Sequence, residues 1–416
     1  MEYERSFSAE SAHKTLNNWL IDKFSIQHLL CDTAYQTSSV LLTKYSDGSM
    51  CNGMGKGLYH KTGAVAEALE HYFGACEDYG DYVYLDASVV SSQDVFENCN
   101  IGRALGAFKN SLVKSTKTYE VSNGDIDYAF TYQKEFYVPV HLMNPFVDLD
   151  SVDVDNACHQ FLLRYASNTG TALGMNRSDA LLHAVNEQIE RHYLSALYMN
   201  ILGMSTEISF ERIDYTKNAY LDKKVEILKK LCFNVDIVLS EGFCGMYFCA
   251  VITNPIKKFK NHLDYIGSGV SLSMFHALDR ALSEALQVYS LMDNQDTRCD
   301  TAQKYRFLSS HNLLKKLISV DVSHLRMSDI RIHDDRMIDN DNNVGNRYFI
   351  KTKSMLKLVC SKLNKGGYRL LVRSKTSAKE PFSVMNTFIP GLDRFCLVRE
   401  GSFVMPHSFL ASNVSL

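Results

Sequence analysis

The sequence predicts a mixed α/β (α+β) protein in which long helices pack against short strands. Several long stretches have apolar residues at helical spacing, whereas shorter stretches rich in β-branched and aromatic residues indicate strands. Three times, a glycine-containing loop leads into a long helix that carries acidic or amide groups, although no repeat of fixed period is present. Only six prolines among 416 residues favour a compact body over domains on linkers.

The first loop–helix unit lies near the N-terminus. Residues 1–45 are expected to form an N-terminal segment, with a helix followed by a strand at residues 38–44. Residues 47–57 are rich in glycine and predict a loop. This loop leads into a helix predicted at residues 59–76.

The second unit lies in the middle of the chain. A strand is expected at residues 135–143, where Pro139 indicates an edge position or a bulge because proline cannot donate a ladder hydrogen bond. A loop at residues 167–174 then opens a helix at residues 178–199. Asp179 near its start suits the positive end of the helix dipole.

The third unit follows a helix and two strands joined by a turn. The helix is predicted at residues 217–232, the two strands at residues 234–239 and 246–253, and the turn between them at residues 241–245. Gly267 and Gly269 then precede a long helix at residues 274–291. Residues 333–346 are the most loop-like stretch and are expected to be mobile.

The composition limits the classes of partner and compartment. A net charge of −3 gives no general attraction to nucleic acids or anionic membranes, so we expect neither as a partner. The 11 cysteines are scattered without a C-x-x-C pair, which favours reduced thiols in a cytoplasmic protein. No signal-like apolar region opens the chain, and no apolar run approaches the ~20 residues that span a bilayer.

Two pairs of glutamates stand out as candidate metal ligands. Glu67 and Glu70 lie on the first long helix, and Glu187 and Glu190 on the second. Residues three apart share a helix face, so each pair presents two carboxylates side by side. Hard divalent cations such as Mg²⁺ prefer oxygen ligands and usually bind together with phosphates. The pairs therefore predict a magnesium–nucleotide site without a phosphate-binding loop.

The third long helix aligns a cation, an acid and an amide on one stripe. Arg280, Glu284 and Gln287 could bind phosphate, metal and the edges of a nucleoside. The alternative is a set of surface ion pairs, because Glu187–Arg191 and Arg280–Glu284 are both four apart and such pairs contribute only ~0.3–0.5 kcal/mol. Three long helices each carry such a face, and each follows a glycine-containing loop. This recurrence favours a binding site over surface ion pairs.

Other nucleotide-binding and catalytic motifs are absent from the sequence. Gly55-Lys56-Gly57 does not match a Walker A loop, because no Ser or Thr follows the lysine. The chain also has no G-x-S-x-G elbow and no H-E-x-x-H motif. Lys56 is a candidate phosphate ligand from its loop, although an exposed loop lysine is an equally ordinary interpretation.

In this order and spacing, the motifs resemble those of the YcaO family of ATP-dependent enzymes. The first glutamate pair, followed by His71 where the family usually has arginine, is similar to the first family motif. The segment at residues 167–191, with Asp179 where glutamate is common, resembles the second and most diagnostic motif. Residues 267–287 resemble the third, and Ile389-Pro390-Gly391-Leu392 is similar to a short motif near the family's C-terminus.

The resemblance implies a fold of layered sheets and long helices that encloses ATP and Mg²⁺. It implies that the four glutamates hold magnesium, that Glu187, Glu190 and Arg191 are catalytic, and that Arg191 and Arg280 contact phosphate. The cofactor-binding residues that it implies are Lys56, Glu67, Glu70, His71, Asp179, Arg280, Glu284 and Gln287. The catalytic domain is expected at residues 46–405, with subregions at 46–150 and 151–405, followed by a short tail at 406–416.

The implied activity is an ATP-dependent cyclodehydratase of peptide natural-product biosynthesis, of the kind that makes bacteriocins. It would phosphorylate a backbone amide oxygen of a ribosomal precursor peptide and form thiazoline or oxazoline rings. The resemblance also implies a leader-peptide-binding partner of the ubiquitin-activating-enzyme type, and a flavin dehydrogenase that acts downstream. A homodimer is a further assembly to be considered beside these partners.

Two alternatives for the function stay open at this point. The enzyme could instead form thioamides or amidines, if sulfide or an amine replaces the side-chain nucleophile. The protein could also be a nucleotide-binding scaffold without catalysis, because Ala172, Met175 and His71 replace residues common in the family. The C-terminal tail lacks the alternating prolines found in many peptide-modifying members.

Overall fold

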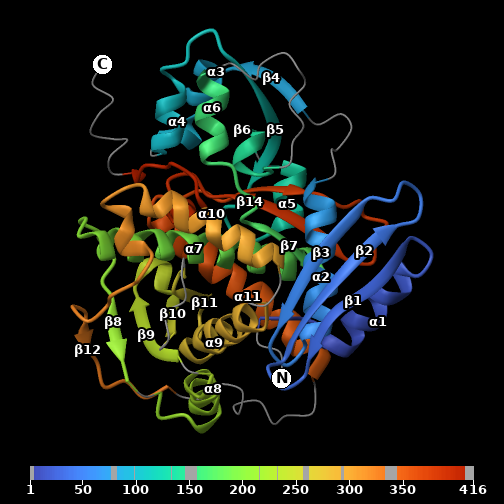
Figure 1. Ribbon diagram of the computed structural model, residues 1–416. Coiled ribbons are helices and arrows are strands. Elements are labelled where there is room, and N and C mark those ends of the chain that lie inside the picture. The colour runs from blue at the N-terminus through green and yellow to red at the C-terminus, as the bar shows by residue number, and fades with distance from the viewer. Residues whose placement is uncertain are drawn as a thin grey trace.

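The computed structural model describes residues 4–75, 82–97, 99–132, 134–145, 157–214, 216–231, 233–255, 262–291, 295–332 and 344–407. In these residues the chain forms three sheets, with helices between and around them (Figure 1). This arrangement confirms the predicted mixed α/β class. In these ranges, no helix combines the length and the apolar character needed to cross a membrane.

The first sheet is three-stranded, antiparallel and formed near the N-terminus. Its strands, paired in sequence order, are β1 (Phe24–Asp32), β2 (Thr37–Lys44) and β3 (Met50–Lys56). α2 (His60–Ala75) packs on β2 and β3, and α1 (Ala9–Leu20) packs beside α2. Leu42, Leu69 and Val384 belong to one buried apolar cluster, which joins this sheet to the next.

The second sheet has six strands that come from distant parts of the sequence. They follow the order β4-β5-β13-β14-β7, with β6 paired to β5. Their bounds are β4 (Tyr82–Asp86), β5 (Leu112–Glu120), β6 (Glu135–Pro139), β7 (Thr171–Gly174), β13 (Leu371–Ser374) and β14 (Ser383–Phe388). The predicted strand at residues 135–143 therefore ends at Pro139, after which residues Val140–Leu142 form a turn of 3₁₀-helix. Within the described residues β6 pairs only with β5, which agrees with the edge position that Pro139 predicts.

The third sheet has five strands in the order β11-β10-β9-β8-β12. Their bounds are β8 (Glu211–Ile213), β9 (Phe233–Glu241), β10 (Tyr247–Pro255), β11 (Tyr265–Ser271) and β12 (Arg326–Met327). The pairing is antiparallel except between β8 and β12. The two strands and the turn predicted at residues 234–253 are thus confirmed.

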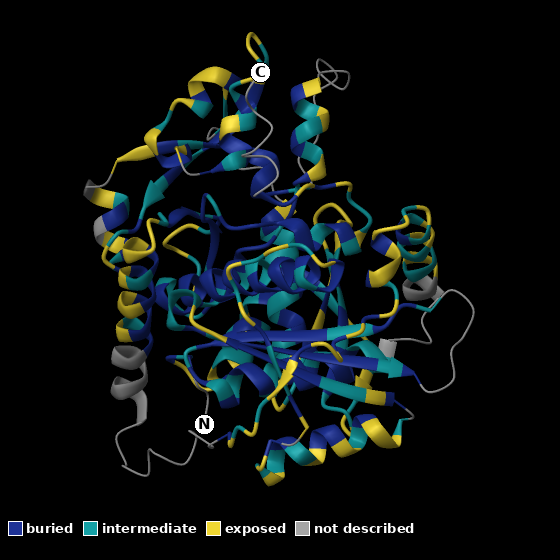
Figure 2. Ribbon diagram, turned by 90° about the vertical axis from the view of Figure 1, so that its left-hand side faces the viewer, coloured by how far each residue is buried: buried dark blue, intermediate teal, exposed yellow. Residues whose placement is uncertain are grey.

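The central element is α7 (Arg177–Leu202), which runs through the middle of the protein (Figure 1). Asn176 caps its start by accepting a hydrogen bond from the Asp179 backbone N–H, and Gly203 ends it in the left-handed conformation with φ of 78°. α7 packs on β7 and β14 of the second sheet and on β11 of the third. Most of its residues are buried, as Figure 2 shows for the interior as a whole.

The other helices surround this core. They are α3 (Ala87–Ser91), α4 (Asn100–Leu105), α5 (Ile126–Tyr132), α6 (Ala157–Arg164), α8 (Ala219–Lys230), α9 (Met274–Leu291), α10 (Gln295–Ser309) and α11 (Val344–Lys365). The helices predicted from apolar spacing at residues 59–76, 178–199, 217–232 and 274–291 correspond to α2, α7, α8 and α9.

The predicted glycine-containing loops are largely strands in the structure, although residues 47–49, 57 and 167–170 lie outside strands. Gly53 lies in β3, Gly174 in β7 and Gly267 in β11, and each strand leads into the helix that packs on it. A Cβ atom on any of these three glycines would lie within 3.0 Å of the helix backbone. The glycines therefore allow close strand–helix packing rather than loop flexibility.

Other predictions cannot be compared with the structure or were incomplete. The predicted loop at residues 333–346 and the C-terminal tail fall largely outside the described residues, at 333–343 and 408–416. Strand β1 was not predicted. The domain boundaries at residues 45 and 405 stay predictions.

Candidate functional site

The three strand–helix units contact one another. α2 contacts β7, α9 contacts β3, and α7 contacts β11, so each helix touches a strand of another unit. This arrangement places the acidic faces of the first two helices and the mixed face of the third around one region. The residues predicted from three separate motifs are thereby brought together.

Three of the four glutamates are fixed by hydrogen bonds, two of which join different strand–helix units. The Leu173 backbone N–H donates to Glu70 at 2.6 Å, so α2 is tied to β7. The Gly170 backbone N–H donates to Glu187 at 3.0 Å. The Ser268 hydroxyl donates to Glu190 at 2.6 Å and ties α7 to β11.

Removal from water raises the pKa of most of these carboxyl groups. It raises the pKa of Glu70 to about 8, and the neighbouring Glu67 and Glu187 add to this shift. Burial also raises the pKa of Glu67 and of Glu187, each only partly offset by nearby cations. The site therefore concentrates carboxylates whose ionisation needs additional positive charge.

Glu190 differs from the other three. Burial alone raises the pKa of its carboxyl group, but Arg191 and Arg280 outweigh that effect and the net pKa is below the ordinary value. The pKa of Arg191 is raised, because Glu190 and Glu187 outweigh the effect of its burial. Glu187, Glu190 and Arg191 thus form a charge cluster inside the protein and not a solvent-exposed pair.

The third helix, α9, contributes the charged residues Arg280 and Glu284. Glu284 forms an ion pair with Lys56 at the end of β3, which links the third unit to the first. Arg280 lies near Glu187 and Glu190 and lowers the pKa of both. The cations of the first and third units therefore face the acids of the second.

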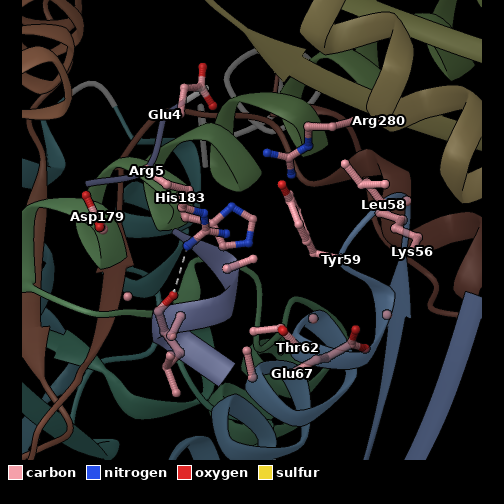
Figure 3. A pocket seen from close by; sticks show the side chains of 18 of the residues that line it. Glu4, Arg5, Lys56, Leu58, Tyr59, Thr62, Glu67, Asp179, His183 and Arg280 are labelled. Carbon is pink, nitrogen blue, oxygen red and sulfur yellow. Dashed lines mark hydrogen bonds between the residues drawn. The ribbon is translucent and has the colours of Figure 1, made fainter. Parts of the chain in front are cut away.

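A cavity of about 350 Å³ opens beside these charges. Among the predicted residues, its walls include Lys56, Glu67, Glu70, Asp179 and Arg280. Figure 3 shows Glu67 and Thr62 on one side, with Arg5, His183, Tyr59 and Arg280 directed toward the same space. The size is in the range of small-molecule and cofactor sites.

The N-terminal segment enters this cavity, which the sequence did not predict. Ser6 donates to Asp179 from its backbone N–H at 3.0 Å and from its hydroxyl at 2.6 Å. Glu4 is buried and accepts from Asn186 at 2.9 Å and from Ser271 at 2.7 Å. These bonds hold Arg5 between them against the cavity, where it donates to the Leu173 carbonyl at 3.3 Å.

His183 is a second residue at the cavity that was not among the predicted ligands. It lies one turn before Glu187 and lines the cavity. Burial, followed by the charge of Arg5 and Arg280, lowers its pKa well below the ordinary value. Its imidazole is therefore neutral at physiological pH.

Six predicted residues do not line the cavity: His71, Glu187, Glu190, Arg191, Glu284 and Gln287. His71 donates to the Asn52 carbonyl of β3 at 2.7 Å, and its positive form lowers the pKa of Glu67. Gln287 is buried in α9, one turn beyond Glu284. The glycines beside Glu67 contact strands: Gly63 lies against β3 and Gly74 against Thr171 of β7.

The protein side chains do not form a complete metal cage. Within the described ranges, no three His, Cys, Asp or Glu side chains lie close enough together to hold a metal ion by themselves. Glu70, Glu187 and Glu190 instead accept hydrogen bonds from the protein.

Solved structures show the same fold. YcaO from Methanopyrus kandleri bound with AMPPCP and Mg²⁺ has a TM-score of 0.64 and 14% identity over 98% of this chain and 98% of that chain. A heterocyclase in complex with substrate and cofactor also has a TM-score of 0.64, at 13% identity over 94% of this chain. The chain spans about half of that heterocyclase, 53% of its length. The E. coli microcin synthetase McbBCD complex gives 0.55 at 12% identity, over 91% of this chain and 95% of that chain.

Sequence comparison gives the family directly. No curated protein is similar enough in sequence to count as a relative. The family model described as YcaO cyclodehydratase, ATP- and Mg²⁺-binding, matches residues 54–393, from Met54 of β3 through the second and third strand–helix units to the Pro390-Gly391 segment. The chain therefore belongs to the YcaO family.

Proposed function

We propose that the protein is an ATP-dependent cyclodehydratase that forms azoline rings in a ribosomal precursor peptide. The observation that carries this proposal is a cavity lined by Glu67, Glu70, Lys56 and Arg280, with Glu187 and Glu190 nearby. Glu187 raises the pKa of Glu70, and Arg280 lowers the pKa of Glu190. Family membership supplies ATP and Mg²⁺ as cofactors. The substrate and the reaction are inferred from these two facts together.

The residues fit a magnesium–nucleotide complex. Carboxyl groups with raised pKa values become good ligands when a cation replaces the lost water. Mg²⁺ usually takes one or two carboxylates and completes its shell with phosphate oxygens and water, so a complete protein cage is not needed. Glu67, Glu70, Glu187 and Glu190 would hold the metal.

The cations would neutralise the phosphates. Lys56 and Arg280 lie at the cavity wall, and Arg191 lies behind the second glutamate pair. We add Arg5 to this group, because the N-terminal segment delivers its guanidinium to the same cavity. Stabilisation of charge that develops during phosphoryl transfer is the main catalytic effect expected of such groups.

The remaining predicted residues would support these groups. Asp179 would position Arg5 through Ser6, and Glu284 would position Lys56. His71 would hold α2 against β3 beside Glu67. Gln287, further along α9, would face the nucleoside.

The proposed reaction depends on phosphorylation of the amide oxygen, which allows that oxygen to leave as phosphate. A Cys, Ser or Thr side chain of the precursor adds to the preceding carbonyl carbon and loses its proton, which leaves the charge on the amide oxygen. ATP supplies the γ-phosphoryl group that this oxygen takes, with release of ADP. The C–O bond then breaks, phosphate leaves, the amide nitrogen loses a proton and the azoline forms. The peptide has lost one water in total.

Partners are part of the proposal. One of the neighbouring folds is the E. coli microcin synthetase McbBCD complex with pro-MccB17 bound, at a TM-score of 0.56. We propose that this protein likewise acts on a precursor peptide, together with a leader-peptide-binding partner of the ubiquitin-activating-enzyme type. A flavin dehydrogenase would oxidise the azoline afterwards.

The test is a double variant, Glu187→Gln with Glu190→Gln, assayed with the precursor and partner present. Phosphate release should fall at least ~100-fold, the scale of losing charged groups in a preorganised site. A matched control changes two exposed glutamates, Glu10→Gln with Glu226→Gln, and should keep the wild-type rate. Unchanged phosphate release in the first variant contradicts the metal assignment.

Mass spectrometry of the precursor separates the reaction classes. Loss of one water per modified residue supports cyclodehydration, whereas exchange of oxygen for sulfur or for an amine indicates a thioamide or amidine product. ATP binding by calorimetry without any phosphate release would favour a non-catalytic scaffold.

A further inference from the structure

Exposed apolar side chains gather at the mouth of the charged cavity. Phe7, Met54, Leu58 and Tyr59 all line it, yet they are 43%, 38%, 61% and 43% exposed. Single exposed apolar residues are common on protein surfaces, but several at the edge of one cavity indicate a binding surface. We call these four residues the apolar rim.

The rim is held in place from both sides. Met54 lies on β3, and Leu58 and Tyr59 lie in the turn between β3 and α2. Gly57 adopts a φ of +75° at this turn and faces Ser283 of α9. Such a backbone conformation favours glycine. The turn is thereby fixed against the third strand–helix unit.

Phe7 reaches the rim from the N-terminal segment. It follows Ser6, whose two hydrogen bonds to Asp179 fix the chain at that point. Ser8 then caps α1 by accepting a hydrogen bond from the Ser11 backbone N–H at 3.2 Å. The position of Phe7 is therefore set on both sides of the residue.

The rim and the acids belong to the same opening. Glu67 and Glu70 line the cavity that also includes the rim, so a molecule that rests on the rim has access to the proposed phosphate site. An amide oxygen must come within bonding distance of the transferred phosphoryl group, so the peptide has to enter a space next to those acids. A peptide that crosses the rim meets that requirement.

We propose that the apolar rim binds the precursor peptide on either side of the modified residue, and that the flanking peptide residues are apolar or aromatic. This inference rests on the proposed function. The alternative occupant is the base of the nucleotide. A base is normally enclosed between side chains, whereas Leu58 is more than half exposed and borders solvent, which suits a chain that continues out of the cavity.

The test measures binding without turnover. Two fluorescent peptides are compared by anisotropy in the presence of Mg²⁺ and a non-hydrolysable ATP analogue: Gly-Leu-Phe-Cys-Phe-Leu-Gly and Gly-Asp-Ser-Cys-Ser-Asp-Gly. The apolar peptide should bind at least about tenfold more tightly, as expected when one or more large apolar side chains become buried. Equal binding of the two peptides overturns the inference.

A matched pair of variants locates the effect. Leu58→Ser changes the rim, and Leu29→Ser changes an equally exposed leucine of β1, at 62%, that does not line the cavity. Leu58→Ser should weaken binding of the apolar peptide about tenfold, and Leu29→Ser should leave it unchanged. Equal losses in both variants indicate non-specific adsorption and overturn the inference.

Binding of the ATP analogue, followed separately by calorimetry, identifies the occupant. If Leu58→Ser weakens binding of the analogue more than binding of the peptide, the rim holds the base and the inference is wrong. Failure of the proposed function looks different, because the wild-type protein would then bind the apolar peptide but release no phosphate and modify no precursor.

Discussion

Both side-chain oxygens of Asp179 accept hydrogen bonds from Ser6, a residue 173 positions earlier in the chain. The bonds are 3.0 Å to the backbone N–H and 2.6 Å to the hydroxyl, and both residues are buried. They hold the N-terminal segment across the start of α7. Arg5 owes its position at the cavity to this contact, because Glu4 and Ser6 are fixed on either side of it.

The first prediction concerns this contact. Ser6→Ala should lower the free energy of unfolding by roughly 1–3 kcal/mol, because one oxygen of a buried carboxylate loses its donor. It should also weaken ATP binding, because Arg5 is less well held. Urea denaturation and calorimetry measure the two effects. Ser92→Ala, which removes an exposed hydrogen bond to the Val89 carbonyl, serves as the control and should do neither. If Ser6→Ala leaves the ATP affinity unchanged, Arg5 does not contribute to nucleotide binding.

The second prediction concerns the ion pair between Lys56 and Glu284. If Glu284 acts on the nucleotide by holding Lys56, then Lys56→Met and Glu284→Gln remove the same function. The loss of ATP-binding free energy in the double variant should be smaller than the sum of the single losses, by roughly 0.5–3 kcal/mol. The same cycle on the exposed pair of Lys217 and Asp329 should show no coupling. If the losses of ATP-binding free energy in the Lys56 and Glu284 variants are additive, the two residues act independently on ATP binding.

The third prediction concerns pH. A carboxyl group whose pKa is higher in the folded than in the unfolded protein binds more protons when folded between the two values, so stability falls as pH rises through that window. For Glu70 the window runs from its ordinary value of 4.5 to about 8. Glu67 and Glu187 shift in the same direction. The free energy of unfolding of the protein without ligands should therefore fall between pH 5 and pH 8.

Glu70→Gln provides the check on this interpretation. It removes the ionising group. In urea denaturation across the same pH range, the free energy of unfolding of the variant should therefore fall less steeply with pH. Mg²⁺ with an ATP analogue should stabilise the wild-type protein most at the upper end of the window, where the carboxylates are ionised. An equal slope in the wild type and in the variant would show that Glu70 does not ionise in this range.

The long helices could be predicted because their signal is local. Apolar residues recur at helical spacing through the stretches that became α2, α7, α8 and α9, and residues three apart must share a face whatever packs on them. The grouping of Glu67 with Glu70, and of Glu187 with Glu190, followed from that spacing alone. That the two pairs share one site was a hypothesis based on their charge and later on the family resemblance, because helical spacing does not say which faces meet.

The glycine-containing strands could not be predicted in the same way. A run such as Gly53-Met54-Gly55 has low strand propensity, and its local pattern indicates a loop. The strand is formed because β3 pairs with β2 and packs closely on α2, and only the tertiary structure contains those partners.

The role of the N-terminal segment was missed for a related reason. Residues 4–7 carry no motif, and their partners are Asp179, Asn186 and Ser271, more than 170 positions away. Asp179 was predicted to bind the cofactor; in the structure it lines the cavity, and both of its oxygens accept hydrogen bonds from Ser6. Contacts of such sequence separation leave no periodicity in a single chain, so only the folded arrangement reveals them.

The last prediction compares two glycines that differ in what surrounds them. In Gly55→Ala the new Cβ atom would lie within 3.0 Å of the His60 and Ala64 backbone, so β3 and α2 must separate. Overpacking of this kind typically costs about 1–3 kcal/mol, and rigid backbone on both sides favours the upper end. In Gly74→Ala the nearest atom is the Thr171 methyl group at 3.7 Å, an ordinary contact.

Gly74→Ala should therefore stabilise α2 by up to ~1 kcal/mol, the difference in helix propensity between the two residues. Urea denaturation of both variants tests the contrast, and circular dichroism confirms that each is folded. Because β3 carries Lys56 to Glu284, Gly55→Ala should also weaken ATP binding, whereas Gly74→Ala should not. If Gly55→Ala is as stable as the wild-type protein, the strand does not pack on α2 as closely as the glycines indicate.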